Sequence, residues 1–244
     1  MEGIHEQEEG DEMRGRTAMA ALAALLALSG CEVSIGSGGD EQKAENSAAP
    51  ATQRFVNSRE NARSEDLRRH YVDFSFEYPA NWTVTDQPTD GTAHNYVRVA
   101  APSIHGYVPY AFHVGHAAAT GDPERDRQLF EELTPEVASQ FGEGLEDYRI
   151  VSIGRMRVGE HDSYGWRFTA TGPPTQGEPG ARIYGRGDIV VPPGSDRGVT
   201  LISMATDRAE GVDSAEEVGE EGPLRAVLDS FRIEAGGGGG EAGK

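Results

Sequence analysis

Apolar and polar residues alternate in short runs through the middle of the chain, which is the pattern of strands with one buried face. The first run places four apolar side chains on one face, at Val72, Phe74, Phe76 and Tyr78. A turn at Pro79-Ala80-Asn81 follows, and further short apolar patterns come at 82–84, 97–101 and 110–114. These segments predict successive strands of one sheet.

A helix is predicted to begin at Pro123. Asp122 supplies a side-chain acceptor for the first free backbone N–H groups, and a proline at the first helical position loses no hydrogen bond. Apolar residues then recur at helical spacing, at Leu129, Leu133, Val137 and Phe141. Because Thr134-Pro135-Glu136 can restart a helix, we expect a kink or two short helices rather than one straight helix.

Strand patterns return after residue 150. The apolar register moves between Ile153 and Met156, which predicts a one-residue bulge near Gly154. A turn at 159–162 leads into the clearest alternation of the chain, at 164–170, so we expect a β-hairpin. Residues 181–191 form a further strand. Residues 199–205 are apolar on both faces, as in a central strand covered from both sides.

The last element is predicted to be a short helix. Ser214 and Glu217 have the spacing of a capping box, and Pro223 opens the helix. Phe231 and Ile233 then close the domain. Strands, a helix, strands and a helix in this order predict an α+β fold with helices on an antiparallel sheet.

Biased segments at both ends leave one folded domain, which we place at residues 70–233. Residues 31–69 are rich in small and polar side chains and predict a flexible tether. Residues 234–244 include five consecutive glycines and predict a disordered tail. Residues 1–12 are acidic and contain no Lys or Arg. We expect them to be a non-native extension ahead of a start at Met13, with Met1 as the alternative start.

Residues 13–30 have the organisation of a secretory signal peptide. Two arginines, Arg14 and Arg16, precede an uncharged run of apolar and small residues from Thr17 to Ala27. This run is too short for a good bilayer span, which needs about 20 apolar residues. The sequence therefore predicts export across a membrane.

Leu28, Ser29, Gly30 and Cys31 resemble the lipobox of bacterial lipoproteins at every position. The resemblance implies a diacylglycerol group on the Cys31 thiol, cleavage before Cys31, and acylation of the new amino terminus by a fatty acid such as palmitate. An uncleaved anchor helix and a buried structural cysteine are the alternatives. Because Cys31 is the single cysteine, no intramolecular disulfide and no metal site built from cysteines can form.

The chain is strongly acidic, with a formal net charge of −19. Processing before Cys31 would remove six acidic residues and two arginines, which leaves −15. A charge of this sign repels phosphate backbones, so we expect no nucleic-acid partner.

Two segments resemble the opening and closing signatures of PsbP-like domains: FSFEYPANWTV at 74–84 and VLDSFRI at 227–233. This fold is also seen in a Ran-binding nuclear import factor and in many bacterial lipoproteins. The resemblance implies an αβα sandwich, with a central antiparallel sheet covered by helices, over residues 70 to 233. It also implies mostly non-catalytic work, as accessory subunits and binding modules, and it assigns no functional residue here.

No catalytic residue, cofactor or metal site is predicted. The common hydrolase and nucleotide-binding signatures are missing, although a serine nucleophile assembled from distant residues stays open. His113 and His116 are three residues apart on a strand, so they point to opposite faces and cannot share one ion without a bend at Gly115. Arg186-Gly187-Asp188, the tripeptide of integrin ligands, lies in a predicted strand, and we interpret it as chance.

A local excess of positive charge is the strongest functional hint. Six arginines fall on neighbouring predicted strands, at Arg149, Arg155, Arg157, Arg167, Arg182 and Arg186. On one concave face they would bind a carboxylate, a phosphate or a segment of an anionic polymer. The structural alternative is that they pair with acids of the covering helices, such as Glu131, Glu132, Glu216 and Glu217.

These patterns predict a lipid-anchored, non-catalytic binding or accessory module on the extracytoplasmic face of a bacterial cell membrane. Its expected partners are the membrane, through the lipid, and either an envelope protein or a small anionic ligand. The alternatives are an envelope enzyme without a recognisable motif and a carrier of lipid or glycolipid.

Overall fold

The computed structural model describes residues 51–62, 65–86, 95–174 and 179–233, which form two sheets and three short or medium helices. Seven strands form a large sheet in the order β3-β4-β5-β9-β8-β7-β6, and three form a small sheet in the order β1-β2-β10. All neighbouring strands are antiparallel. The large sheet comprises β3 (Thr83–Asp86), β4 (Asn95–Ala100), β5 (Tyr110–Ala118), β6 (Glu146–Val158), β7 (His161–Thr171), β8 (Arg182–Val190) and β9 (Arg197–Thr206).

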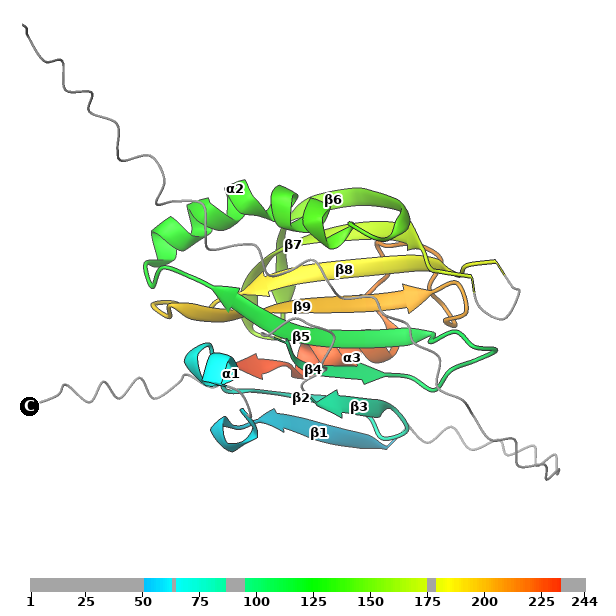
Figure 1. Ribbon diagram of the computed structural model, residues 1–244, viewed down its shortest axis with the longest axis horizontal. Helices are drawn as coiled ribbons and strands as arrows, with labels where there is room; N and C mark the ends of the chain where they lie inside the picture. Colours follow the sequence, from blue (N-terminus) through cyan, green and yellow to red (C-terminus); the bar gives the residue numbers. More distant parts are fainter. Residues whose placement is uncertain (1–50, 63–64, 87–94, 175–178, 234–244) are drawn as a thin grey trace, which may run out of the picture.

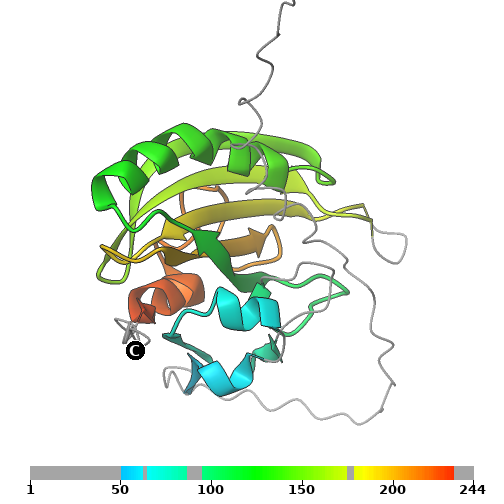
Figure 2. The ribbon, with the colours of Figure 1, turned by 60° about the vertical axis from the view of Figure 1, so that its left-hand side comes forward.

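The remaining elements cover the two faces of the large sheet (Figures 1 and 2). The helix α2 (Pro123–Phe141) packs on one face, which we call the α2 face. The helix α3 (Gly222–Ser230) and the small sheet pack on the other, the α3 face. The small sheet comprises β1 (Thr52–Asn57), β2 (Phe74–Pro79) and β10 (Arg232–Ile233), and a 3-10 turn (Arg59–Asn61) and α1 (Glu65–Arg69) connect β1 to β2.

Aromatic rings fill both cores. On the α2 face, Phe141 packs against Phe168, with 5.0 Å between ring centroids, and against the fully buried Trp166. On the α3 face, Phe231 packs against Phe74 and Phe112. The expected α+β architecture with antiparallel strands is confirmed, and β9 is the expected central strand, between β5 and β8. The second sheet was not predicted.

The helix α2 begins as predicted but does not break. The Asp122 side chain accepts hydrogen bonds from the backbone N–H groups of Glu124 and Arg125. The helix then runs through Pro135 without interruption, so the prediction of two short helices is wrong. Pro135 is exposed and has no N–H to donate to the Glu131 carbonyl, and the neighbouring Thr134 and Val137 stay buried.

Strands β6 and β7 form the predicted hairpin, with Val158 opposite His161. The bulge is not near Gly154: the register shifts between Glu146 and Arg149 and again between Ile150 and Ser152. Gly154 itself lies in regular pairing opposite Gly165. The run Ile150-Val151-Ser152-Ile153 is mostly apolar, so the alternation there does not show where the strand changes face.

Part of the predicted tether is folded. Strand β1, at 52–57, pairs along the whole of β2, so the folded body begins well before residue 70. Strand β1 is held on β2 by apolar contacts as well, because the Phe55 ring packs on Phe74 and Phe76. The Asn57 amide also donates to the Val72 carbonyl, 2.7 Å away. The signal peptide, the lipobox, the tether before residue 51 and the tail lie outside the described residues. Among the described helices, none is both long and apolar enough to cross a membrane.

Candidate functional site

The structure distributes the arginine cluster over both faces of the large sheet. Arg155 projects on the α2 face, where its guanidinium binds the carboxylate of Glu131 on α2 at 2.9 Å. Arg157 is exposed at the hairpin and donates to the Glu160 carbonyl. These two arginines therefore do not join the others in one concave site. Arg155 instead pairs with a covering helix, as the structural alternative expected.

Arg167 and Arg186 lie opposite each other on β7 and β8, on the α3 face, and both are held by protein groups. Arg167 donates to the carbonyls of Ala215 and Val218 at 2.7 and 3.0 Å and pairs with Glu220. Arg186 is buried and forms an ion pair with the fully buried Asp188 at 2.8 Å. The Arg167 guanidinium therefore binds the segment before α3, and the Arg186 guanidinium stabilises the interior of the sheet. Neither group is free to bind a ligand.

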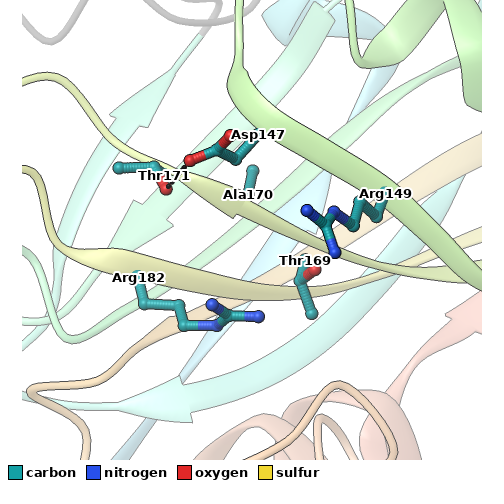
Figure 3. A pocket seen from close by; sticks show the side chains of 6 residues that line it. All are labelled: Asp147, Arg149, Thr169, Ala170, Thr171 and Arg182. Atoms are coloured by element: carbon teal, nitrogen blue, oxygen red, sulfur yellow. Dashed lines mark hydrogen bonds between the residues drawn. The ribbon is translucent and has the colours of Figure 1, made fainter.

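The two remaining arginines line a shallow pocket at the end of the sheet (Figure 3). Arg149 lies opposite Thr169 across β6 and β7, and Arg182 lies opposite Thr171 across β7 and β8. Both guanidinium groups extend toward Thr169 from opposite sides (Figure 3). Ala170 and Asp147 complete the lining. We call this group of six residues the β6–β8 pocket.

Charge and size limit what the β6–β8 pocket can bind. Within the described part of the chain, Arg149 and Arg182 have no acidic partner; Arg182 packs instead over the Tyr184 ring, 5.9 Å from its centroid. Two guanidinium forks and two hydroxyl groups are suited to bind a carboxylate or phosphate. The volume is about 120 Å³. Sites that enclose a drug-sized molecule have roughly 300 to 1,000 Å³, so this pocket takes one functional group.

The Asp147 carboxylate partly offsets the positive charge of the pocket. It is a non-glycine residue with φ of 50°, in the left-handed region that asparagine and aspartate tolerate better than most residues. It stands in the first bulge of β6, which turns its side chain to the rim. Its carboxylate accepts a long hydrogen bond of 3.4 Å from the Thr171 hydroxyl (Figure 3). A bound anion would therefore lie on the arginine side of the pocket.

Sequence reasoning found the arginines but not their companions. Asp147, Thr169 and Thr171 were not singled out, although the two threonines occupy the polar positions of the β7 alternation. The pairing of Arg149 with Thr169 depends on the bulge between Ile150 and Ser152, and local pattern does not fix such a register.

The two histidines of β5 point to opposite faces, as their spacing predicted. His113 lies opposite Ile202, in the core of the α2 face, whereas His116 lies opposite Val199, in the core of the α3 face. Burial lowers the pKa of His113 to about 3, and the neighbouring Arg98 lowers it further. Its imidazole is therefore neutral in neutral solution. The two histidines do not share one ion, because they lie on opposite faces of the sheet.

Comparison with solved structures finds chains of similar path and very different sequence. CyanoP, the cyanobacterial PsbP of Synechocystis sp. PCC 6803, is 12% identical, with 79% of this chain and 98% of that chain covered and a TM-score of 0.46. LpqN of Mycobacterium tuberculosis, described as involved in cell envelope biogenesis, is 12% identical, with 75% and 91% covered and a TM-score of 0.42. The Ran-binding protein Mog1p of Saccharomyces cerevisiae is 8% identical, with 66% and 89% covered and a TM-score of 0.39.

No family model and no curated protein matches the chain. Identities and TM-scores of this size do not place it in a family.

Proposed function

We propose that this protein is a lipid-anchored, non-catalytic binding module of the bacterial cell envelope, with a PsbP-like domain of the αβα type. The lipobox at Leu28 to Cys31 supports the anchor and the location. The two signature segments support the domain type, because they meet in the fold: β10 pairs with β2, and Phe231 packs on Phe76. The apolar residues of the two segments thus belong to the same core.

The ligand of the module is a carboxylate or phosphate group bound in the β6–β8 pocket. The observation that carries this proposal is the contrast among the arginines. Arg155, Arg167 and Arg186 each have an acidic partner, and Arg157 donates to the Glu160 carbonyl at the hairpin. Arg149 and Arg182 have no acidic partner in the described part of the chain, and they alone of the six line a common pocket. In a chain of net charge −19, two guanidinium groups that line one pocket without an acidic partner among the described residues form a local site for anions.

A protein side chain, a chain terminus or a small molecule can supply this anionic group. The pocket is too small and too polar to enclose an acyl chain, so it does not support a role as a lipid carrier.

Titration of the full chain in detergent with acetate and with inorganic phosphate, followed by NMR, tests the proposal. We expect amide shifts confined to the strands around Arg149, Thr169 and Arg182. The double substitution Arg149→Ala/Arg182→Ala should raise the Kd by at least about tenfold, the effect of losing one charged hydrogen bond or more. Arg127→Ala is the matched control, since Arg127 is an exposed arginine paired with Glu124 on α2.

Shifts that persist in the double variant, or that are lost equally in the control, would show that the anions bind by general charge attraction and would overturn the assignment of the pocket. Capture of an envelope protein that depends on both arginines would identify a protein as the source of the anionic group.

A further inference from the structure

The two outer strands of the large sheet differ sharply. Strand β3 has four residues, Thr83–Asp86, and two of them are exposed polar side chains. Strand β6 has 13 residues and exposes three aliphatic side chains: Ile150 is 38% exposed, Val151 43% and Ile153 38%. Proteins usually keep outer strands short or charged, because a long apolar edge pairs with other strands. The edge at β6 therefore requires an explanation.

The second bulge decides which side chains of β6 share a face. In a regular strand, Ile150 and Ile153 would point to opposite faces. The extra residue at Val151 changes this: Ile150 lies opposite Phe168 and Ile153 lies opposite Trp166, and both aromatic partners belong to the core of the α2 face. The two isoleucines therefore form one apolar strip on the α2 face of the edge.

We propose that β6 pairs antiparallel with β6 of a second copy of this chain, around a two-fold axis at Val151 and Ser152. An axis perpendicular to the sheet keeps each face of one copy continuous with the same face of the other, so paired residues must share a face. Without the bulge, this rule excludes a pairing of Ile150 with Ile153. With the bulge, Ile150 of each copy lies opposite Ile153 of the other, and both apolar strips become covered.

The charges along β6 favour a second copy in this direction. The strand begins with acidic residues, Glu146 and Asp147, and ends with basic residues, Arg155 and Arg157. Antiparallel pairing places the acidic end of one copy beside the basic end of the other, whereas parallel pairing would place like charges together.

The same register brings Arg149 opposite Gly154. Both residues lie on the α3 face, since their partners on β7 are Thr169 and Gly165, which share that face with Arg167. A Cβ atom added to Gly154 would meet nothing within 4 Å, so packing inside one copy does not require a glycine there. In the proposed dimer, a glycine opposite Arg149 of the second copy lets that arginine side chain stay over Thr169, in the β6–β8 pocket.

Disulfide cross-linking in cells tests both the pairing and its register. One full chain carries Ile150→Cys and a second, with a different tag, carries Ile153→Cys. The two are expressed together and oxidised. The opposed positions are in contact. Two copies of position 150 are offset by the distance between the β7 partners Phe168 and Trp166, about 7 Å along the strand, in addition to the spacing between the strands. A disulfide spans less than about 7 Å between Cα atoms, so the mixed cross-link should far exceed either symmetric one.

Sedimentation of the full chain in non-ionic detergent measures the strength of pairing. We expect a dimer at about 100 μM chain and at least a tenfold higher Kd for Ile153→Lys. Val56→Lys is the control, because Val56 is 53% exposed on β1, the outer strand of the small sheet. Circular dichroism establishes that both variants are folded. A monomeric wild-type chain, equal weakening by both substitutions, or no excess of the mixed cross-link would overturn the proposal.

Discussion

At the scale of single residues, the most informative group is the Arg186–Asp188 ion pair. Asp188 is fully buried and also accepts a hydrogen bond of 2.8 Å from the Ser163 hydroxyl. Arg186 donates to Asp188 and to the Arg157 carbonyl. The Arg-Gly-Asp tripeptide is thus an interior feature of β8. It cannot act as an integrin-type ligand, because both charged side chains are enclosed.

Asp188→Asn should lower the free energy of unfolding by about 3 to 5 kcal/mol, because it leaves the buried Arg186 charge with only the longer contact to Glu220, at 3.7 Å. The matched control is Glu131→Gln, which breaks the exposed pair with Arg155. It should cost at most about 1 kcal/mol. Urea denaturation followed by circular dichroism measures both changes. Equal losses in the two variants would show that burial does not govern the strength of these ion pairs.

At the scale of elements, two glycines allow β8 to carry the aromatic core of the α2 face. A Cβ atom on Gly185 would lie 2.0 Å from the Phe168 ring, and one on Gly187 would lie 2.3 Å from the Trp166 ring. Each large ring of β7 therefore occupies the space that a side chain of β8 would need. The alternation Gly185, Arg186, Gly187, Asp188 matches this division: rings lie over one face of the strand, and the ion pair lies on the other.

Gly187→Ala should destabilise the fold by about 1 to 3 kcal/mol, because the added methyl group displaces a fully buried tryptophan ring. Gly172→Ala is the control: its Cβ would meet atoms at 3.5 Å, which is ordinary contact. Its effect should be within about 1 kcal/mol of zero. The melting temperature and the near-ultraviolet circular dichroism of Trp166 distinguish the Gly187 variant from the Gly172 variant. An unchanged signal and melting temperature in the Gly187 variant would contradict this account of the packing.

Local pattern predicted most elements because alternation and capping are properties of neighbouring residues. The run from Val72 to Tyr78, the cap at Asp122 and the hairpin after Val158 are all of this kind. Features that depend on distant partners were missed. Strand β1 has only Phe55 and Val56 as large apolar residues, and its pairing with β2 supplies what its own sequence lacks.

The candidate site was predicted only in outline for the same reason. Local positive charge indicated the arginines, but which of them have an acidic partner depends on acids that the fold brings near from other parts of the chain. Glu220, which holds Arg167, lies 53 residues away in sequence, and no local spacing indicates that contact.

At the scale of the whole molecule, the anchor at Cys31 is the central prediction. Cys31→Ala removes every acyl chain that the lipobox implies, and each buried methylene contributes about 0.8 kcal/mol to membrane binding. The variant should move from the detergent-rich to the aqueous phase in detergent partition, and mass spectrometry should show the loss of the lipid mass. Val33→Ala, just beyond the lipobox, is the control. Equal partition of the Cys31 variant and the wild-type chain would contradict lipid anchoring.

The arrangement β1-β2-β10 has a consequence for orientation. The polypeptide enters the folded body at β1 and leaves it at β10, so both connections emerge from the small sheet, and β6 lies across the molecule from it (Figures 1 and 2). Strand β1 begins 21 positions after residue 31, a reach of at most about 75 Å. For a chain held by its lipid, the small sheet is thus the side to which the tether attaches, and β6 lies on the side remote from that attachment.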